Sequence, residues 1–121
     1  MTKRYGHLIE HWNAAKDEMR TILIRCAREK RTITYGELSA EIQAASIHPY
    51  SYAMANMLDE IGYENMAQGK TALPTLVVRK SDGRPGPGFF RKSYASGASG
   101  DDLEQFWQEQ FARVCEEWKD G

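Results

Sequence analysis

The sequence predicts a mainly α-helical protein with a small β element, and three observations lead to this expectation. Apolar residues recur every three or four positions in several stretches of the 121-residue chain, as expected for helices that bury one face. Only one run, Leu76 to Val78, is rich in β-branched residues and typical of a strand. After it, Ser81-Asp-Gly83 indicates a tight turn, and prolines then alternate with glycines up to Gly88. We therefore expect helices arranged around one strand and a projecting loop.

Length and composition predict a single cytoplasmic domain over residues 1–121. A chain of this size can bury enough surface to form a core without disulfides or bound metal ions. Its apolar runs are far shorter than the roughly 20 residues that span a bilayer, and no apolar signal segment follows Lys3 and Arg4, so we expect no membrane partner. Cys26 and Cys115 lie in helical patterns without metal-ligand spacing, which predicts two small core residues.

The first helix is predicted from about His7 to Glu29, with a break allowed near Asn13. Its apolar stripe consists of Leu8, Trp12, Ala15, Met19, Ile22, Leu23 and Cys26. Basic residues gather where this helix ends, which is ordinary for the negative end of a helix dipole.

A short strand and a short helix should follow. Thr32 to Thr34 can form the strand, and Thr34 with Glu37 fits a capping box, in which each side chain satisfies a free backbone amide. The helix is expected from Tyr35 to Ile42, followed by a loop to His48.

The third helix is predicted to begin at Pro49, whose fixed φ suits a first helical position, with His48 at the cap. Gly69 is its expected stop, although Gly62 could end or loosen it earlier. One face should be buried, namely Tyr50, Ala53, Met54, Met57, Leu58 and Ile61. The other face carries Ser51, Tyr52, Asn56 and Asp59.

The C-terminal part should contain a connector and one more helix. Residues 91–100 are rich in Ser, Gly and Ala, which predicts a flexible segment with little packing of its own. Asp101 or Asp102 should then cap an added C-terminal helix, whose aromatic stripe indicates core packing. The stripe consists of Leu103, Phe106, Trp107, Phe111, Val114, Cys115 and Trp118.

Charge is unevenly distributed, although the net charge is only −1. Residues 70–92 hold six basic residues against Asp82 alone, whereas residues 101–121 hold seven acids against two bases. We call residues 79–92 the basic arm. A basic arm of this kind can contact nucleic acid, but it can equally be a loop that its charges keep soluble. The basic residues are Lys70, Arg79, Lys80, Arg84, Arg91 and Lys92.

The predicted order is helix, strand, helix, helix, strand, arm and helix. Three helices followed by a strand and a projecting arm are typical of a winged helix-turn-helix, in which the third helix commonly enters the major groove of DNA.

Four blocks of sequence carry a family resemblance over roughly residues 16–90. They are Thr34-Tyr-Gly-Glu-Leu38, Tyr52-Ala-Met-Ala-Asn-Met-Leu58, Leu73-Pro-Thr-Leu-Val-Val78 and Ser81-Asp-Gly83. In order and spacing they resemble the DNA-binding domain of alkylguanine-DNA alkyltransferases and alkyltransferase-like proteins. Those proteins carry a TYGELA-type helix start, a RAVGxAL-type recognition helix, and a PCHRV motif followed by a strand and an SDG turn.

The resemblance implies DNA binding without alkyl transfer. The family's nucleophilic cysteine aligns with Thr75, its histidine with Leu76 and its arginine with Val77. A threonine beside two aliphatic residues has neither the low pKa nor the base that such a nucleophile requires. The arginine that replaces a flipped base in the family aligns with Tyr52, which can stack or wedge. Tyr35 matches the family tyrosine near a DNA phosphate, although it can also simply close the helix start.

We therefore expect a non-catalytic protein that binds duplex DNA, without a cofactor or a metal ion. His7 and His11 lack a third ligand nearby in sequence. The predicted DNA-binding residues are Tyr35, Ser51, Tyr52, Asn56, Arg79, Lys80, Arg84, Arg91 and Lys92. A protein-protein interaction module on the same scaffold is the alternative, favoured by the near-neutral charge and the acidic last helix. An unidentified enzyme that uses Tyr35, Tyr52 or His48 is a third possibility.

Overall fold

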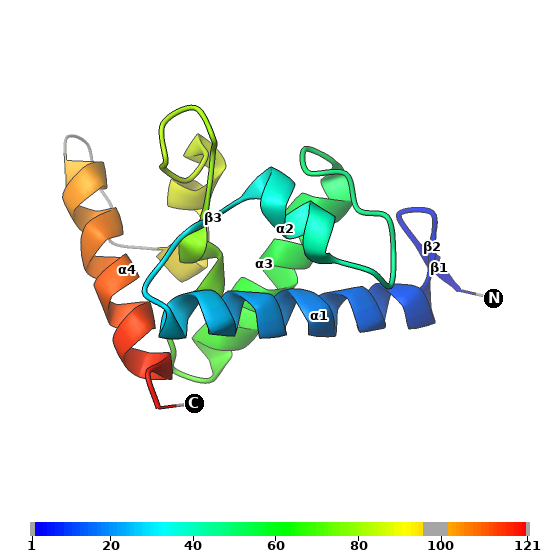
Figure 1. The fold of residues 1–121 in the computed structure, drawn as a ribbon, viewed down its shortest axis with the longest axis horizontal. Coiled ribbons are helices and arrows are strands. Elements are labelled where there is room, and N and C mark those ends of the chain that lie inside the picture. The colour runs from blue at the N-terminus through cyan, green and yellow to red at the C-terminus, as the bar shows by residue number, and fades with distance from the viewer. Residues whose placement is uncertain (1, 96–101, 121) are drawn as a thin grey trace.

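The computed structural model describes residues 2–95 and 102–120 and is mainly helical, as predicted (Figure 1). The long helix α1 (Ile9–Arg28) lies along one side of the molecule, and α4 (Leu103–Trp118) packs against its C-terminal part. The helices α2 (Tyr35–Glu41) and α3 (Tyr52–Ala67) both contact α1, and the loop of the basic arm projects on the side of the molecule away from α1.

The strands form two small sheets. In the first, β1 (Lys3–Arg4) pairs antiparallel with β2 (His7–Leu8). In the second, β3 (Ile33–Thr34) pairs in parallel with β4 (Val77–Val78), so that Ile33 lies opposite Val77. The short strand before α2 is therefore confirmed. The N-terminal hairpin was not predicted, and the first helix begins at Ile9 rather than His7 because the preceding residues pair as strands.

The strand predicted from Leu76 to Val78 is β4, which begins one residue later, and the segment Leu73–Leu76 before it is a 3₁₀ helix at the centre of the molecule. All four of its residues are buried, and it contacts α1, α3 and α4. Pro74 near its start explains the difference, because proline has no N–H for a sheet and its φ suits a helical turn. Asn65 at the end of α3 fixes the segment, since its buried side-chain oxygen accepts from the Leu73 N–H at 2.8 Å.

Helix α1 runs without a break through Asn13, and its predicted stripe is buried from Trp12 to Cys26. Both cysteines are free and buried, as expected. Helix α3 continues through Gly62 and ends two residues before Gly69, whose φ is +73°.

The start of α3 differs from the prediction. Ser51 is the cap, because its hydroxyl oxygen accepts from the Met54 N–H at 3.1 Å, and Tyr52 is the first helical residue. Pro49 lies two residues before the cap, so it is not a first helical residue, and His48 is not the cap. Tyr50 consequently lies outside the helix and is 72% exposed rather than buried.

The connector after the basic arm also differs where the structure describes it. The 3₁₀ helix Pro87–Arg91 lies near the end of the basic arm, and the 3₁₀ helix Ser93–Ala95 follows in the connector. Ala95 is buried in a second apolar cluster with Val78, Phe89 and Trp107. The three- to four-residue spacing of apolar residues cannot reveal helices as short as these. The rest of the connector and Asp101 lie outside the described residues. Asp102 precedes α4 but its side chain makes no capping hydrogen bond.

The predicted stripe of α4 faces the core along most of its length. Trp107, Val114 and Cys115 are buried, and Phe106, Phe111 and Trp118 are partly buried against the two clusters. Leu103 at the start of the helix is 36% exposed. None of the helices in residues 2–95 and 102–120 has both the length and the apolar character that crossing a bilayer requires.

Candidate functional site

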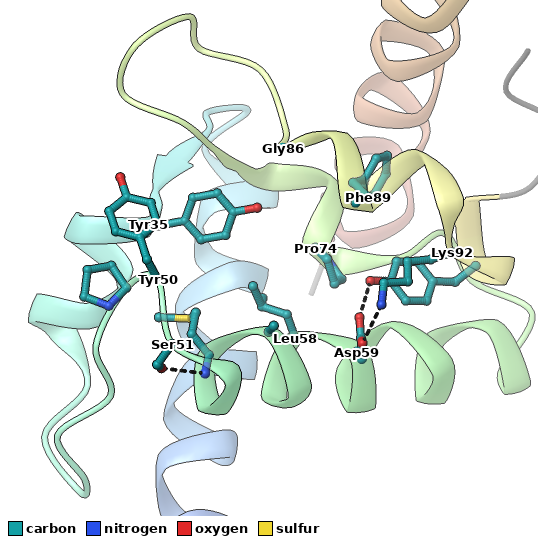
Figure 2. A pocket seen from close by; sticks show the side chains of 14 residues that line it. Tyr35, Tyr50, Ser51, Leu58, Asp59, Pro74, Gly86, Phe89 and Lys92 are labelled. Atoms are coloured by element: carbon teal, nitrogen blue, oxygen red, sulfur yellow. Dashed lines mark hydrogen bonds and ion pairs between the residues drawn. The ribbon is translucent and has the colours of Figure 1, made fainter. Parts of the chain in front are cut away.

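A pocket of about 320 Å³ lies where the start of α3, the start of α2 and the basic arm meet (Figure 2). Tyr35 and Tyr50 lie at one end of it, and Asp59 and Lys92 lie at the other. Pro74, Leu58 and Phe89 supply apolar walls between the two ends. The pocket is therefore mostly apolar, with a few polar groups at its ends, as in many small-ligand sites.

Tyr35 reaches the pocket because it is the first residue of α2. The capping box is present as predicted: the Glu37 N–H donates to Thr34 Oγ1 at 3.1 Å, and the Thr34 N–H donates to Glu37 Oε1 at 2.9 Å. The Tyr35 ring lies 6.1 Å from that of Tyr50. Burial raises the pKa of the Tyr35 phenol, and the backbone of Gly86 beside it partly offsets this rise. The phenol is neutral at neutral pH and can donate one hydrogen bond.

At the other end of the pocket, Asp59 joins α3 to the last residue of the basic arm, Lys92, and to Tyr94 just after it. Its carboxylate accepts from Lys92 Nζ at 2.9 Å and from the Tyr94 hydroxyl at 2.8 Å. Burial and the hydrogen bond to Asp59 both raise the pKa of the Tyr94 phenol. The ring of Tyr94 lies over Gly62 of α3, where a Cβ atom would approach it to 2.8 Å. Only glycine allows so close a contact here.

The start of α3 is built by a short chain of hydrogen bonds. The Ser51 hydroxyl donates to the His48 carbonyl at 2.8 Å, and the Tyr50 N–H donates to His48 Nδ1 at 3.2 Å. These bonds hold Tyr50 and Tyr52 outward, so that 72% and 83% of their surfaces remain exposed. Asn56 donates to the Tyr52 carbonyl at 2.9 Å, one turn before it on α3.

The basic arm begins with a turn around Gly83, whose φ of +67° favours glycine. The turn predicted from Ser81-Asp-Gly83 is thus confirmed, and the Arg79 N–H and Arg84 carbonyl close it at 2.9 Å. Arg79 forms an ion pair with Asp82 inside the turn.

Arg84 is bound to α4 rather than left open to solvent. Its Nε atom lies 2.6 and 2.7 Å from the two carboxylate oxygens of Glu104, and its guanidinium lies 4.6 Å from the Trp107 ring centre. By contrast, Lys80 and Arg91 have no ion pair among the described residues.

Three of the predicted DNA-binding residues line one pocket, namely Tyr35, Ser51 and Lys92. Tyr52 and Asn56 lie on the exposed side of α3. Arg79, Arg84 and Lys92 each have an acidic partner within the chain, whereas the sequence suggested open cations.

No pattern in the sequence indicated Asp59 and Tyr94 as pocket residues, because the two meet only when the 3₁₀ helix Ser93–Ala95 packs on α3. Gly62, which has no Cβ atom and so leaves room for the Tyr94 ring, is the one residue type in the sequence that is consistent with this packing. Tyr50, assigned to the core from its spacing, lines the pocket instead.

Thr75 offers no nucleophile to the pocket. Pro74 lines the pocket wall, but Thr75 is buried behind it and its Oγ1 atom has no hydrogen-bond partner. Its carbonyl accepts from Trp107 Nε1 at 2.9 Å. Among the described residues no group of His, Cys, Asp and Glu side chains is arranged to hold a metal ion.

No family model, curated protein or solved structure gives a significant match to this chain. The resemblance to alkyltransferase-like proteins therefore stays a prediction from the sequence blocks.

Proposed function

We propose that the chain is a non-catalytic DNA-binding protein of alkyltransferase-like, winged helix-turn-helix architecture. Its interface would combine the exposed start of α3 with the basic arm, and its partner would be duplex DNA in the cytoplasm. Two free, buried cysteines suit a reducing compartment.

The observation that carries this proposal is that α3 and the basic arm border one pocket that opens between them. The pocket volume of about 320 Å³ lies at the lower end of the range for small-ligand sites, which suits a single flat ring such as a nucleobase. The half-buried ring of Tyr35 and the apolar walls can receive the face of that ring, as in enzymes that take a base out of the duplex.

The start of α3 supplies two further features of a DNA interface. Helix N-termini attract phosphate groups because their backbone N–H groups and dipole are positive. Tyr52 stands exposed on the first turn, in the place of the family arginine that fills the gap left by a flipped base. An aromatic ring can stack on bases there without carrying charge.

Lys80 and Arg91 are the best candidates for phosphate contacts, since no acidic side chain of the described residues pairs with them. Arg79, Arg84 and Lys92 would have to exchange an internal partner for a phosphate, which reduces what each can contribute. Chemistry at the pocket is not proposed, because Thr75 is buried away from it.

The internal pairing of these three cations also favours the second candidate, a protein-protein interaction module. Tyrosine is enriched where proteins contact one another, and the exposed tyrosines Tyr50 and Tyr52 would then be anchors for a protein partner.

Binding of fluorescent duplexes, measured by anisotropy at low salt, separates the two candidates. We expect the wild-type protein to bind a duplex with an unpaired base more tightly than a fully paired one. Tyr52→Ala should weaken binding with little change in its salt dependence, because stacking releases no counterions. Incubation with alkylated-guanine DNA should leave the protein mass unchanged. Absence of binding to every duplex would favour the protein-interaction module.

A further inference from the structure

A second hollow, of about 300 Å³, lies beside the pocket on the other side of the segment 48–51. The N-terminal hairpin and the start of α3 form it, with Tyr5 and His7 on one element and Tyr52 on the other. Ser51 lines both this hollow and the pocket described above, so the two are immediate neighbours.

The N-terminal hairpin places Tyr5 at the wall of the second hollow. Tyr5 and Gly6 form the two-residue turn between β1 and β2, with φ of +51° and +83°. Such turns match the twist of the strands they join. The Tyr5 ring stacks on Trp12 of α1 at 5.6 Å, yet half of the Tyr5 surface stays exposed. The hollow therefore has an aromatic wall, Tyr5, that belongs to neither core cluster.

The polar side chains of the second hollow suit the edge of a base. His48 Nδ1 accepts from the Tyr50 N–H, so in the neutral imidazole the proton is on Nε2, which can donate. Ser46 adds a hydroxyl that can donate or accept. An unstacked base is bound by aromatic side chains that stack on its face and by hydrogen-bond donors and acceptors that meet its edge.

Part of the segment 48–51 separates the two hollows, because His48 lines the second hollow, Pro49 and Tyr50 line the first pocket, and Ser51 lines both. Stacked bases on one strand are only about 3.4 Å apart. Two neighbouring bases could therefore occupy the two hollows only if they were separated from each other and unpaired.

We propose that the second hollow binds the nucleobase next to the one in the first pocket, so that the protein recognises two consecutive unpaired nucleotides. This inference rests on the proposed DNA-binding function. It makes the N-terminal hairpin part of the DNA interface and defines the ligand as locally melted DNA rather than a single displaced base.

The test compares duplexes with one and with two adjacent unpaired adenines, by anisotropy at a fixed salt concentration. Each base that stacks on aromatic side chains should tighten binding about tenfold. The duplex with two unpaired adenines should therefore bind about tenfold more tightly than the duplex with one. Replacing the second adenine by fluorescent 2-aminopurine adds a local readout. Its emission should fall on binding as the base stacks against tyrosine.

Two variants and one control locate the effect. Tyr5→Asn removes the ring while keeping a residue that tolerates positive φ, and Tyr52→Leu removes the other tyrosine. Tyr5→Asn should lower the ratio of the two affinities towards one, whereas Tyr52→Leu, whose side chain also serves the proposed DNA interface, should in addition weaken binding of the one-base duplex. Met66→Ala, an exposed position at the far end of α3, should leave the ratio unchanged. Thermal melting of each variant verifies that it is folded.

The possible failures are distinct. Equal binding of the one-base and two-base duplexes by the wild-type protein, or brighter 2-aminopurine on binding, would overturn this inference while the proposed function stands. If the protein binds none of the three duplexes, namely the fully paired duplex and those with one and two unpaired adenines, the proposed function fails and this inference fails with it.

Discussion

The Nζ atom of Lys92 lies 2.9 Å from a carboxylate oxygen of Asp59, which joins the end of the basic arm to the middle of α3. Tyr94 donates to the other oxygen of the same carboxylate. The carboxylate thus stabilises the position of the pocket wall, and it also neutralises one of the cations assigned to DNA from the sequence. Asp59 therefore both stabilises the pocket wall and reduces the positive charge that the basic arm can offer to DNA.

Gly62 is predicted to be essential for this packing. Alanine normally stabilises a helix relative to glycine by about 1 kcal/mol, but a Cβ at residue 62 would meet the Tyr94 ring at 2.8 Å. We expect Gly62→Ala to lower the free energy of unfolding by about 1–3 kcal/mol, as overpacking does. Gly36→Ala in α2 is the control, because nothing lies within 4 Å of its Cβ position. It should be neutral or stabilising in urea unfolding. Equal effects of the two substitutions would contradict the packing described for Tyr94.

Thr75→Val tests whether the buried hydroxyl has any role. Because Thr75 Oγ1 is buried without a partner, a methyl group of the same shape should leave stability unchanged or raise it by up to about 1 kcal/mol. Thr71→Val is the matched control. The Thr71 hydroxyl donates to Glu117 at 2.9 Å, so its loss should cost about 1–2 kcal/mol. A marked loss of stability in Thr75→Val would indicate a partner for that hydroxyl.

Alkaline pH should destabilise the protein through Tyr94. The folded state raises the pKa of this phenol, so the unfolded chain loses its proton first, and stability falls as pH rises above about 10. Tyr94→Phe should be less stable than wild type at pH 8 but lose less stability between pH 8 and 11. Urea midpoints at both pH values give the comparison. Parallel loss in the two proteins would assign the effect to other groups, such as Tyr35.

Much of the fold was predictable from the sequence, because the helices and the capping box at Thr34 are local features. The apolar stripe of α1 and the turn at Gly83 are confirmed for the same reason. The elements that depend on tertiary contacts were not predictable. The 3₁₀ helix at Leu73 and the ordered segment up to Ala95 exist because several helices pack on them at once.

The candidate site was predictable only in part. Tyr35 lines the pocket because its place in the capping box fixes its position. The ion pairs of Arg84 and Lys92 join residues 20 and 33 positions apart, and no local pattern reveals them. A sequence therefore indicates how many cations an arm carries, but not how many of them remain open to a ligand.

Arg84 is predicted to contribute to stability more than to DNA binding. Its contacts with Glu104 and Trp107 are partly exposed, so Arg84→Ala should cost about 1 kcal/mol in urea unfolding. Arg79→Ala, which breaks only a pair inside the turn, should stay within about 0.5 kcal/mol. A neutral Arg84→Ala would show that the arm is not held by α4. This difference makes Arg84 unsuitable for testing phosphate contacts.

The salt dependence of DNA binding in the wild type and in a Lys80→Ala, Arg91→Ala double variant tests the central claim most directly. Each phosphate contact contributes about 0.9 to the slope of log affinity against log salt on duplex DNA. If both cations contact phosphates, the slope should flatten by about 1.8 while the melting temperature is unchanged. Lys119→Ala, at the far end of α4, should keep the wild-type slope. A wild-type protein that binds no duplex at low salt, or a double variant with an unchanged slope, would contradict DNA binding through the basic arm.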